Sequence, residues 1–223
     1  MIVAEGKPLS QVVDMVRGRE RLLVAACAEC VTVCEAGGEK EAVLLAQALR
    51  LWGKRTGVSW TVDTITIQRQ CEPEWVEELS GVVEAKGYDA IISLACGVGV
   101  QFLAKRFPKL RVVPGLNTMF GGGTAAPGVW EEWCGFCGDC VLDKTAGICP
   151  VVRCAKSLSN GPCGGSSGGR CEVSPEIPCA WVEILQRLAL QGRLDGPEEI
   201  APPKDWSKAS LGPRKVVKQG GAG

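Results

Sequence analysis

The sequence predicts an α/β protein whose first half is a small parallel-sheet domain and whose second half is an irregular, cysteine-rich module closed by a helix. Two observations support this prediction. Between residues 19 and 116, short apolar and β-branched runs alternate with helix-forming segments, which is the pattern of βαβ units and a parallel sheet. From residue 134 onward the chain is rich in Gly, Pro, Ser and Cys, so it has few side chains from which to build a hydrophobic core.

The elements of the first half follow from local signals. The stretch 39–54 contains strong helix formers with apolar residues three and four apart, and 58–67 is mostly β-branched. Pro73 suits the first turn of a helix, Gly87 can cap its end, and Pro108 stops the next helix. In chain order the sequence predicts a helix at 8–18, a strand at 21–26, a helix at 39–54, a strand at 58–67, a helix at 73–86, a strand at 88–95, a helix at 97–107 and a strand at 110–113. Residues 1–116 are therefore expected to form a flavodoxin-like or Rossmann-like domain.

The second half divides into three further segments. The glycine-rich stretch 117–128 is predicted to be a linker, and 129–194 is predicted to be the cysteine-rich module. A closing helix at 181–191 has Trp181, Ile184, Leu185 and Leu188 on one face. Residues 195–223 have no hydrophobic periodicity and carry four positive charges from Lys208 onward, so they are expected to form an extended or disordered tail or to lie over a partner.

Composition limits the class of protein. The 223 residues are 46% hydrophobic and 22% charged, with a formal net charge of zero, so nothing indicates a nucleic acid or an anionic membrane as partner. No apolar run approaches the ~18 residues of a membrane span, and the N-terminus lacks the apolar core of a signal peptide. We therefore expect a cytoplasmic protein without a membrane span.

Cysteine and histidine usage indicates soft-metal binding. In a reducing compartment the thirteen cysteines are better explained as metal ligands than as disulfides. Histidine is absent, which excludes zinc sites with two cysteines and two histidines as well as Rieske clusters, and removes the commonest acid–base side chain.

Eight cysteines lie within residues 134–179. The spacing Cys134-x2-Cys137-x2-Cys140 lets three thiolates bind one face of a cubane, and a later cysteine followed by proline, here Cys149, often completes such a run. The remaining members of the group are Cys154, Cys163, Cys171 and Cys179. Eight thiolates suit two [4Fe-4S] clusters, or one cluster and one four-cysteine zinc site, and buried or disulfide-bonded cysteines are the simpler alternative.

The other five cysteines belong to the predicted sheet. Cys27, Cys71 and Cys96 each follow a predicted strand, and the carboxyl ends of parallel strands meet at one edge of a sheet. We therefore expect a third cluster on these three cysteines and Cys30, with Cys34 as a buried thiol or an exchanged fourth ligand. All thirteen cysteines are thus candidate metal ligands.

No flavin or folate site is expected in the chain itself. The pair Gly97 and Gly99 lacks the third glycine of the dinucleotide-binding fingerprint. No catalytic residue is predicted, because no acid–base apparatus is evident in the sequence.

Two stretches, CAECVTVCEAGGEKE from residue 27 and CGFCGDCVLDKTAGICPVVRCAKSLSNGPCGGSSGGRCEV from residue 134, followed by CAW from residue 179, resemble a known family. They are similar to the MetV-type iron–sulfur subunit of methylenetetrahydrofolate reductase, also described as the methylenetetrahydrofolate reductase C-terminal family. The resemblance covers nearly all of residues 21–190. The family has glycines beside its first cysteine, where this chain has Ala26 and Ala28.

The resemblance implies an accessory subunit without a catalytic site of its own. The cysteine sets described above would hold two to three [4Fe-4S] clusters, with one zinc ion possible in place of a cluster, and the resemblance implies that FMN or FAD is bound only by the partner subunit. Electrons would pass from a ferredoxin or a larger redox complex to the flavin-containing subunit, which reduces methylenetetrahydrofolate in the reductive acetyl-CoA pathway of acetogenic bacteria. The alternative is a zinc-binding structural scaffold that docks the flavin subunit.

Overall fold

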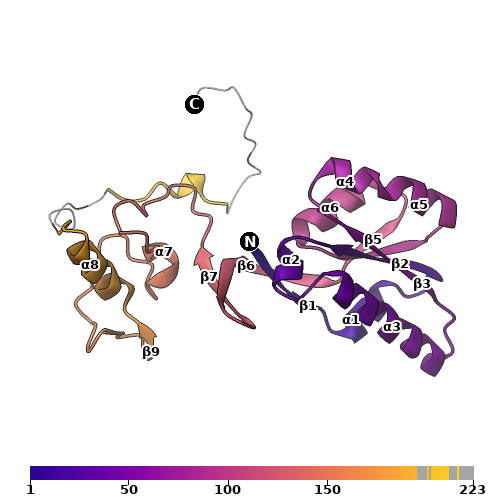
Figure 1. Cartoon of the computed structure of the whole chain (residues 1–223), viewed down its shortest axis with the longest axis horizontal. Helices are drawn as coiled ribbons and strands as arrows, with labels where there is room; N and C mark the ends of the chain where they lie inside the picture. Colours follow the sequence, from indigo (N-terminus) through magenta and orange to yellow (C-terminus); the bar gives the residue numbers. More distant parts are fainter. Residues whose placement is uncertain (195–199, 201, 211–214, 216–223) are drawn as a thin grey trace. The chain divides into compact units, whose positions relative to one another are not determined.

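The computed structural model describes residues 1–194, 200, 202–210 and 215 (Figure 1). The chain divides into two compact units, Met1–Glu131 and Glu132–Gly223.

The main sheet of the first unit has four strands in the order β3-β2-β4-β5, and all three strand pairs are parallel. Leu22 of β2 lies opposite Val62 of β3 and Ala90 of β4. The strand bounds are Arg21–Cys27 for β2, Thr61–Ile67 for β3, Ala90–Leu94 for β4 and Arg111–Pro114 for β5. The predicted parallel α/β sheet is confirmed.

Helices cover both faces of this sheet (Figure 1). Leu22, Val24 and Ala26 of β2 pack in the core on one face, whereas Leu23 and Ala25 pack in the core on the other. This alternation follows from the two-residue period of a strand, and burial on both faces is typical of parallel sheets. The first face carries α1 (Leu9–Met15) and α3 (Glu39–Thr56), and the second carries α4 (Pro73–Glu77), α5 (Leu79–Lys86) and α6 (Gly97–Arg106).

Two helical details differ from the prediction. The single helix expected at 73–86 is divided at Glu78 into α4 and α5, although Gly87 caps its end in the left-handed region as predicted, with φ of 60°. A four-residue helix that the sequence does not predict, α2 (Cys30–Val33), follows β2.

A second, antiparallel sheet has the order β1-β6-β7. Its strands are β1 (Ile2–Gly6), β6 (Leu116–Ala126) and β7 (Val129–Cys134). The stretch 117–128 is therefore strand and turn rather than the linker that its glycines predict. A Cβ on Gly122 would lie 2.0 Å from the carbonyl oxygen of Glu131, so glycine here permits two backbones to approach closely.

The second unit has little regular structure. Its elements are α7 (Pro150–Arg153), β8 (Arg170–Cys171), β9 (Ser174–Pro178), α8 (Ala180–Leu190) and the 3-10 helix η2 (Trp206–Lys208). The predicted closing helix is confirmed as α8. The core of this unit is a small cluster made of Ala146, Ile148, Trp181, Ile184 and Leu188.

Part of the predicted tail, namely 195–199, 201, 211–214 and 216–223, lies outside the described residues. None of the helices in the described part of the chain has the length and apolar character of a membrane span.

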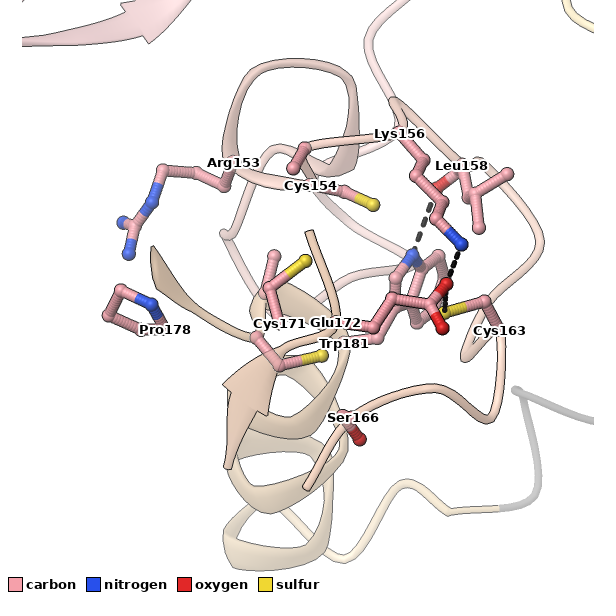
Figure 2. A pocket seen from close by; sticks show the side chains of 13 residues that line it. Arg153, Cys154, Lys156, Leu158, Cys163, Ser166, Cys171, Glu172, Pro178 and Trp181 are labelled. Carbon is pink, nitrogen blue, oxygen red and sulfur yellow. Dashed lines mark hydrogen bonds and ion pairs between the residues drawn. The ribbon is translucent and has the colours of Figure 1, made fainter. Parts of the chain in front are cut away.

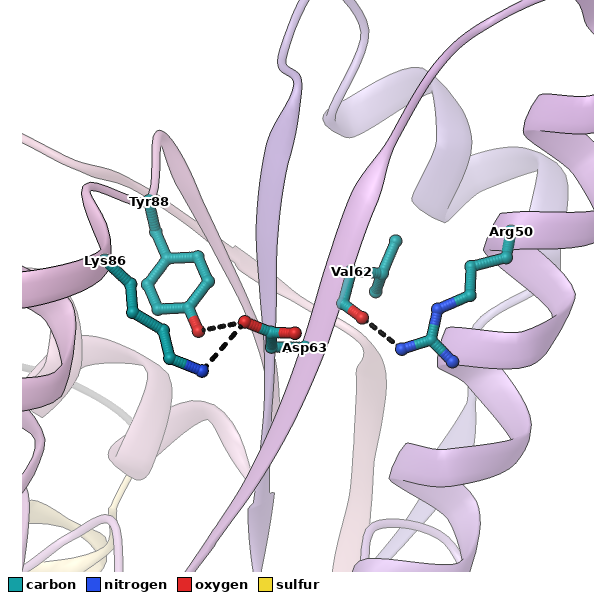
Figure 3. Close-up of polar contacts among 5 residues, drawn as sticks. All are labelled: Arg50, Val62, Asp63, Lys86 and Tyr88. Atoms are coloured by element: carbon teal, nitrogen blue, oxygen red, sulfur yellow. Dashed lines mark hydrogen bonds and ion pairs between the residues drawn. The ribbon is translucent and has the colours of Figure 1, made fainter.

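In the first unit, two side chains donate hydrogen bonds to the Asp63 carboxylate (Figure 3). The Asp63 carboxylate on β3 accepts hydrogen bonds from the Tyr88 hydroxyl at 2.6 Å and from the Lys86 ammonium at 3.1 Å. These bonds, the one from Tyr88 first, hold the pKa of Asp63 below its usual value of 3.8. Beyond β3 in the same view, the Arg50 guanidinium of α3 donates to the Val62 carbonyl.

We expect Tyr88→Phe to lower the free energy of unfolding of the first unit by about 1 kcal/mol at neutral pH, because it removes a hydrogen bond to a carboxylate. The folded pKa of Asp63 is depressed, so this stabilisation is present above the unfolded pKa and is lost as the pH falls through the folded pKa. Urea unfolding, followed in the β2 and β3 peptides by pulsed hydrogen exchange and mass spectrometry, should show a difference at pH 7 that shrinks at acid pH. A difference of equal size at both pH values would assign the cost to ring packing and contradict this account.

Candidate metal centres

Four cysteines of the second unit line one pocket (Figure 2). They come from different elements: Cys154 is the C-cap of α7, Cys163 lies in the following loop, Cys171 ends β8, and Cys179 is the N-cap of α8. All four were predicted as metal ligands from the sequence. The structure therefore places four thiols that are up to 25 positions apart in the sequence around one pocket.

Local geometry explains how Cys171 and Cys179 meet. The strands β8 and β9 form a short antiparallel hairpin in which Arg170 lies opposite Pro178. The Cys179 amide donates to the Gly169 carbonyl at 2.9 Å, which ties the start of α8 to the start of this hairpin. The hairpin thus returns the chain so that Cys179 and Cys171 line the same pocket.

The Trp181 indole fixes the loop that leads to Cys163. Its Nε1 donates to the Leu158 carbonyl at 2.9 Å (Figure 2). A Cβ on Gly161 would lie 2.4 Å from the indole ring, so the backbone lies directly against it and only glycine fits. Trp181 is 7% exposed and belongs to both the small core and the pocket lining. The core of this unit and its thiol pocket are therefore continuous.

An ion pair lies at the mouth of the pocket. The Lys156 ammonium pairs with the Glu172 carboxylate, which also accepts a hydrogen bond from the Cys163 thiol at 3.7 Å (Figure 2). Lys156 and Glu172 are each 39% exposed, so the pair is partly screened by solvent. Neither residue was predicted as part of the site, although Glu172 follows Cys171 directly.

The other four cysteines of the module lie on and beside one loop. Cys134 ends β7, Cys137 and Cys140 follow in the loop, and Cys149 is the N-cap of α7. This loop lies alongside α7: a Cβ on Gly135 would be in van der Waals contact with Val151 and Val152. The Arg153 guanidinium lies over the Trp133 ring, 5.7 Å from its centroid. The structure thus brings the Cys134–Cys140 loop to the helix that begins after Cys149.

The described part of the C-terminal segment covers this loop. The Ser210 amide donates to the Phe136 carbonyl at 2.9 Å. A Cβ on Gly138 would lie 2.1 Å from the Lys208 carbonyl oxygen. The Lys204 ammonium pairs with the Asp139 carboxylate at 3.6 Å, and its side chain is only 5% exposed. Sequence reasoning missed this contact, because a buried lysine in an aperiodic segment gives no local signal.

The remaining cysteines lie in the first unit. Cys27 ends β2, Cys30 begins α2, Cys71 precedes α4 and Cys96 is the N-cap of α6. Cys34 is 4% exposed, and its sulfur accepts a hydrogen bond from the Ala4 amide at 3.5 Å.

None of the thirteen cysteines forms a disulfide bond. Across residues 1–194, 200, 202–210 and 215, no three or more Cys, Asp or Glu side chains form a group that could hold a metal ion. The metal ligands expected from the sequence therefore stay predictions.

Comparison with known proteins finds one family whose model matches part of the chain. Residues 113–207 match the family model described as methylene-tetrahydrofolate reductase C terminal. The matched range includes all eight cysteines between 134 and 179 but less than half of the 223-residue chain. No curated protein and no solved structure matches the chain. Residues 113–207 of this protein are thus similar to the family described as methylene-tetrahydrofolate reductase C terminal.

Proposed function

We propose that this chain is the electron-transferring iron–sulfur subunit of a methylenetetrahydrofolate reductase. It would accept electrons from a ferredoxin or a larger redox complex and pass them to the flavin of a separate catalytic subunit. The observation that carries the proposal is the pocket lined by Cys154, Cys163, Cys171 and Cys179, which lies within the residues that match the reductase family.

The donor set fits iron–sulfur clusters. The pocket supplies four thiols, and the Cys134–Cys140 loop together with Cys149 supplies four more. Thiolates are the ligands that iron–sulfur clusters require, and eight of them suit two [4Fe-4S] clusters. When bound, such clusters would supply one-electron carriers.

Helix α7 joins the two thiol sets. Cys149 is its N-cap and Cys154 is its C-cap, with only four helical residues between them. At 1.5 Å per residue this helix is about 6 Å long. Cys149 of one proposed ligand set and Cys154 of the other are therefore held a short, fixed distance apart, as electron transfer between neighbouring centres requires.

The residues beside the thiols set the local polarity and charge of the proposed sites rather than move protons. Trp181 is buried beside the pocket, and the 202–210 segment covers the Cys134–Cys140 loop. Lys156 places a positive charge beside the pocket thiols. Solvent exposure and nearby charge are the means by which proteins tune cluster potentials. With no histidine in the chain, hydride and proton chemistry on the folate is assigned to the flavin subunit.

The proposal is tested by electron delivery. The chain, purified without oxygen and reduced with dithionite that is then removed, is mixed with the oxidised flavin-containing reductase subunit, and flavin absorbance is followed. We expect rapid bleaching of the flavin, and we expect Cys163→Ser to slow it strongly while Cys34→Ser does not. A chain that docks the flavin subunit but contains zinc, no iron, and does not bleach the flavin would establish the structural-scaffold alternative instead.

We expect the second unit to lose its structure when metal is removed. Its buried apolar cluster is small, and burial at ~25 cal/mol per Å2 cannot offset ordering costs of ~1 to 2 kcal/mol per residue over such a segment. After treatment with a chelator, limited proteolysis should cut within residues 134–179 and leave a fragment that contains the main sheet. Equal protease resistance with and without metal would contradict this expectation.

We expect Lys156→Met to make the reduction potential of one cluster more negative by roughly 10–40 mV. The attraction between partly exposed opposite charges is worth about 0.2–1 kcal/mol. For a one-electron couple, about 59 mV corresponds to a tenfold change in the equilibrium constant. The reduced cluster carries the additional negative charge that Lys156 would offset. Redox titration monitored by EPR measures the shift, and Lys156→Arg should retain the original potential. An unchanged potential in Lys156→Met would show that this ammonium does not act on a cluster.

A further inference from the structure

Three cysteines of the first unit meet at one edge of the parallel sheet. Cys27 is the last residue of β2 and lies opposite Ile67, the last residue of β3. Cys71 follows β3 by four positions, and Cys96 follows the end of β4 by two. Since β2 lies between β3 and β4, the Cys27 end is flanked by the loops that carry the other two. This edge is where parallel sheets commonly bind ligands.

A single buried side chain ties these three segments together. Gln70 is fully buried, and its Nε2 donates to the carbonyls of Ala25 and Ala26 at 2.9 and 3.0 Å. Its Oε1 accepts a hydrogen bond at 2.6 Å from the hydroxyl of Ser93, which is also fully buried. A buried amide is costly unless it is hydrogen-bonded. The residues that bond to Gln70 lie shortly before Cys27 and Cys96 in the chain, and Gln70 itself directly precedes Cys71.

Helix α6 packs against the same point. A Cβ on Gly99, in the first turn of α6, would lie 2.8 Å from the Cβ of Gln70. Only glycine allows this approach. Cys96 is the N-cap of this ten-residue helix, so the start of α6 fixes its backbone beside the Gln70 side chain.

Ion pairs at the surface join the loops after β2 and β3. The Arg69 guanidinium pairs with the Glu29 carboxylate at 3.6 Å and with the Glu72 carboxylate at 3.8 Å. Glu29 directly precedes Cys30, and Glu72 directly follows Cys71.

A fourth cysteine is carried by the loop after β2. The Thr32 hydroxyl donates to the Cys27 carbonyl at 2.7 Å, and the Cys27 amide donates to the Gly37 carbonyl at 3.0 Å. A Cβ on Gly37 would lie 2.2 Å from the Leu94 carbonyl oxygen. The loop that contains Cys30 is therefore folded back against the ends of β2 and β4.

We infer that the first unit holds a metal centre of its own, a four-thiolate site formed by Cys27, Cys30, Cys71 and Cys96. A donor set of thiolates alone selects a soft metal, either a zinc ion or an iron–sulfur cluster. Cys34 is not a ligand, because its sulfur is buried against the backbone of β1.

This inference does not depend on the proposed function. None of the four cysteines lies within residues 113–207, which match the reductase family. The site would exist even if the second unit held no cluster.

Metal analysis of single variants of the full chain tests the inference. Iron, zinc and acid-labile sulfide are measured in protein purified without oxygen. We expect Cys71→Ser and Cys96→Ser each to lose one centre, while Cys34→Ser keeps the full content. Loss of zinc alone identifies an ion, and matched loss of iron and sulfide identifies a cluster. Cys163→Ser, in the second unit, should lose a different centre, so the double variant Cys71→Ser with Cys163→Ser should lose both. Unchanged metal content in the Cys71 and Cys96 variants overturns the site.

A second measurement uses the unaltered protein and does not depend on how variants fold. Cys30 and Cys71 are partly exposed, so an alkylating reagent should reach them unless a metal holds them. We expect both to be protected in the native protein and modified after chelation, as read by peptide mass spectrometry, while buried Cys34 is the control that stays protected in both states. Equal alkylation of Cys30 and Cys71 before and after chelation overturns the proposal.

Discussion

The second unit has to hold a long irregular chain in place around very few buried side chains. Its apolar cluster centres on Trp181, Ile184 and Leu188 of one helix, whereas the first unit has two extensive cores on the two faces of its sheet. Conformational entropy opposes the ordering of every residue, so the glycine-rich loops need another source of stability. Under the proposed function, metal bonds to the thiols around Trp181 would supply it, and folding and metal binding of the unit would then be one process.

Both units position thiols by the same means, which is to attach them to the ends of regular elements. Cys96, Cys149 and Cys179 are N-caps of helices. Cys27 and Cys171 end strands. A backbone fixed on one side of the residue limits where the sulfur can move, so ligands can be arranged before the metal binds. The two units differ in what supports these ends: a buried Gln70 network in the first and the Trp181 indole in the second.

Much of the first unit could be predicted from the sequence because its signals are local. Strand and helix periodicity, Pro73 and Gly87 each act within a few residues, and the cysteines at strand ends follow from parallel topology. The β1–β6 pairing could not be predicted in this way, because it joins Ile2 with Gly121 across more than a hundred positions. The glycines of 117–128 suggest a flexible linker, although Gly122 serves close strand packing. Gln70, Lys156 and Glu172 were missed because polar residues show their role only when their partners are known. The choice between zinc and clusters was left open by the sequence, and it depends on chemistry that thiol positions alone do not determine.

The central claim is that the cysteine-rich unit holds iron–sulfur clusters, and Mössbauer spectroscopy with quantitative iron, sulfide and zinc analysis of the anaerobically purified chain tests it most directly. Two [4Fe-4S] clusters in this unit predict at least about eight iron atoms and about eight acid-labile sulfides per chain, with the Mössbauer signature of cubanes. Zinc as the bound metal, with no acid-labile sulfide and no iron signal, would contradict the claim.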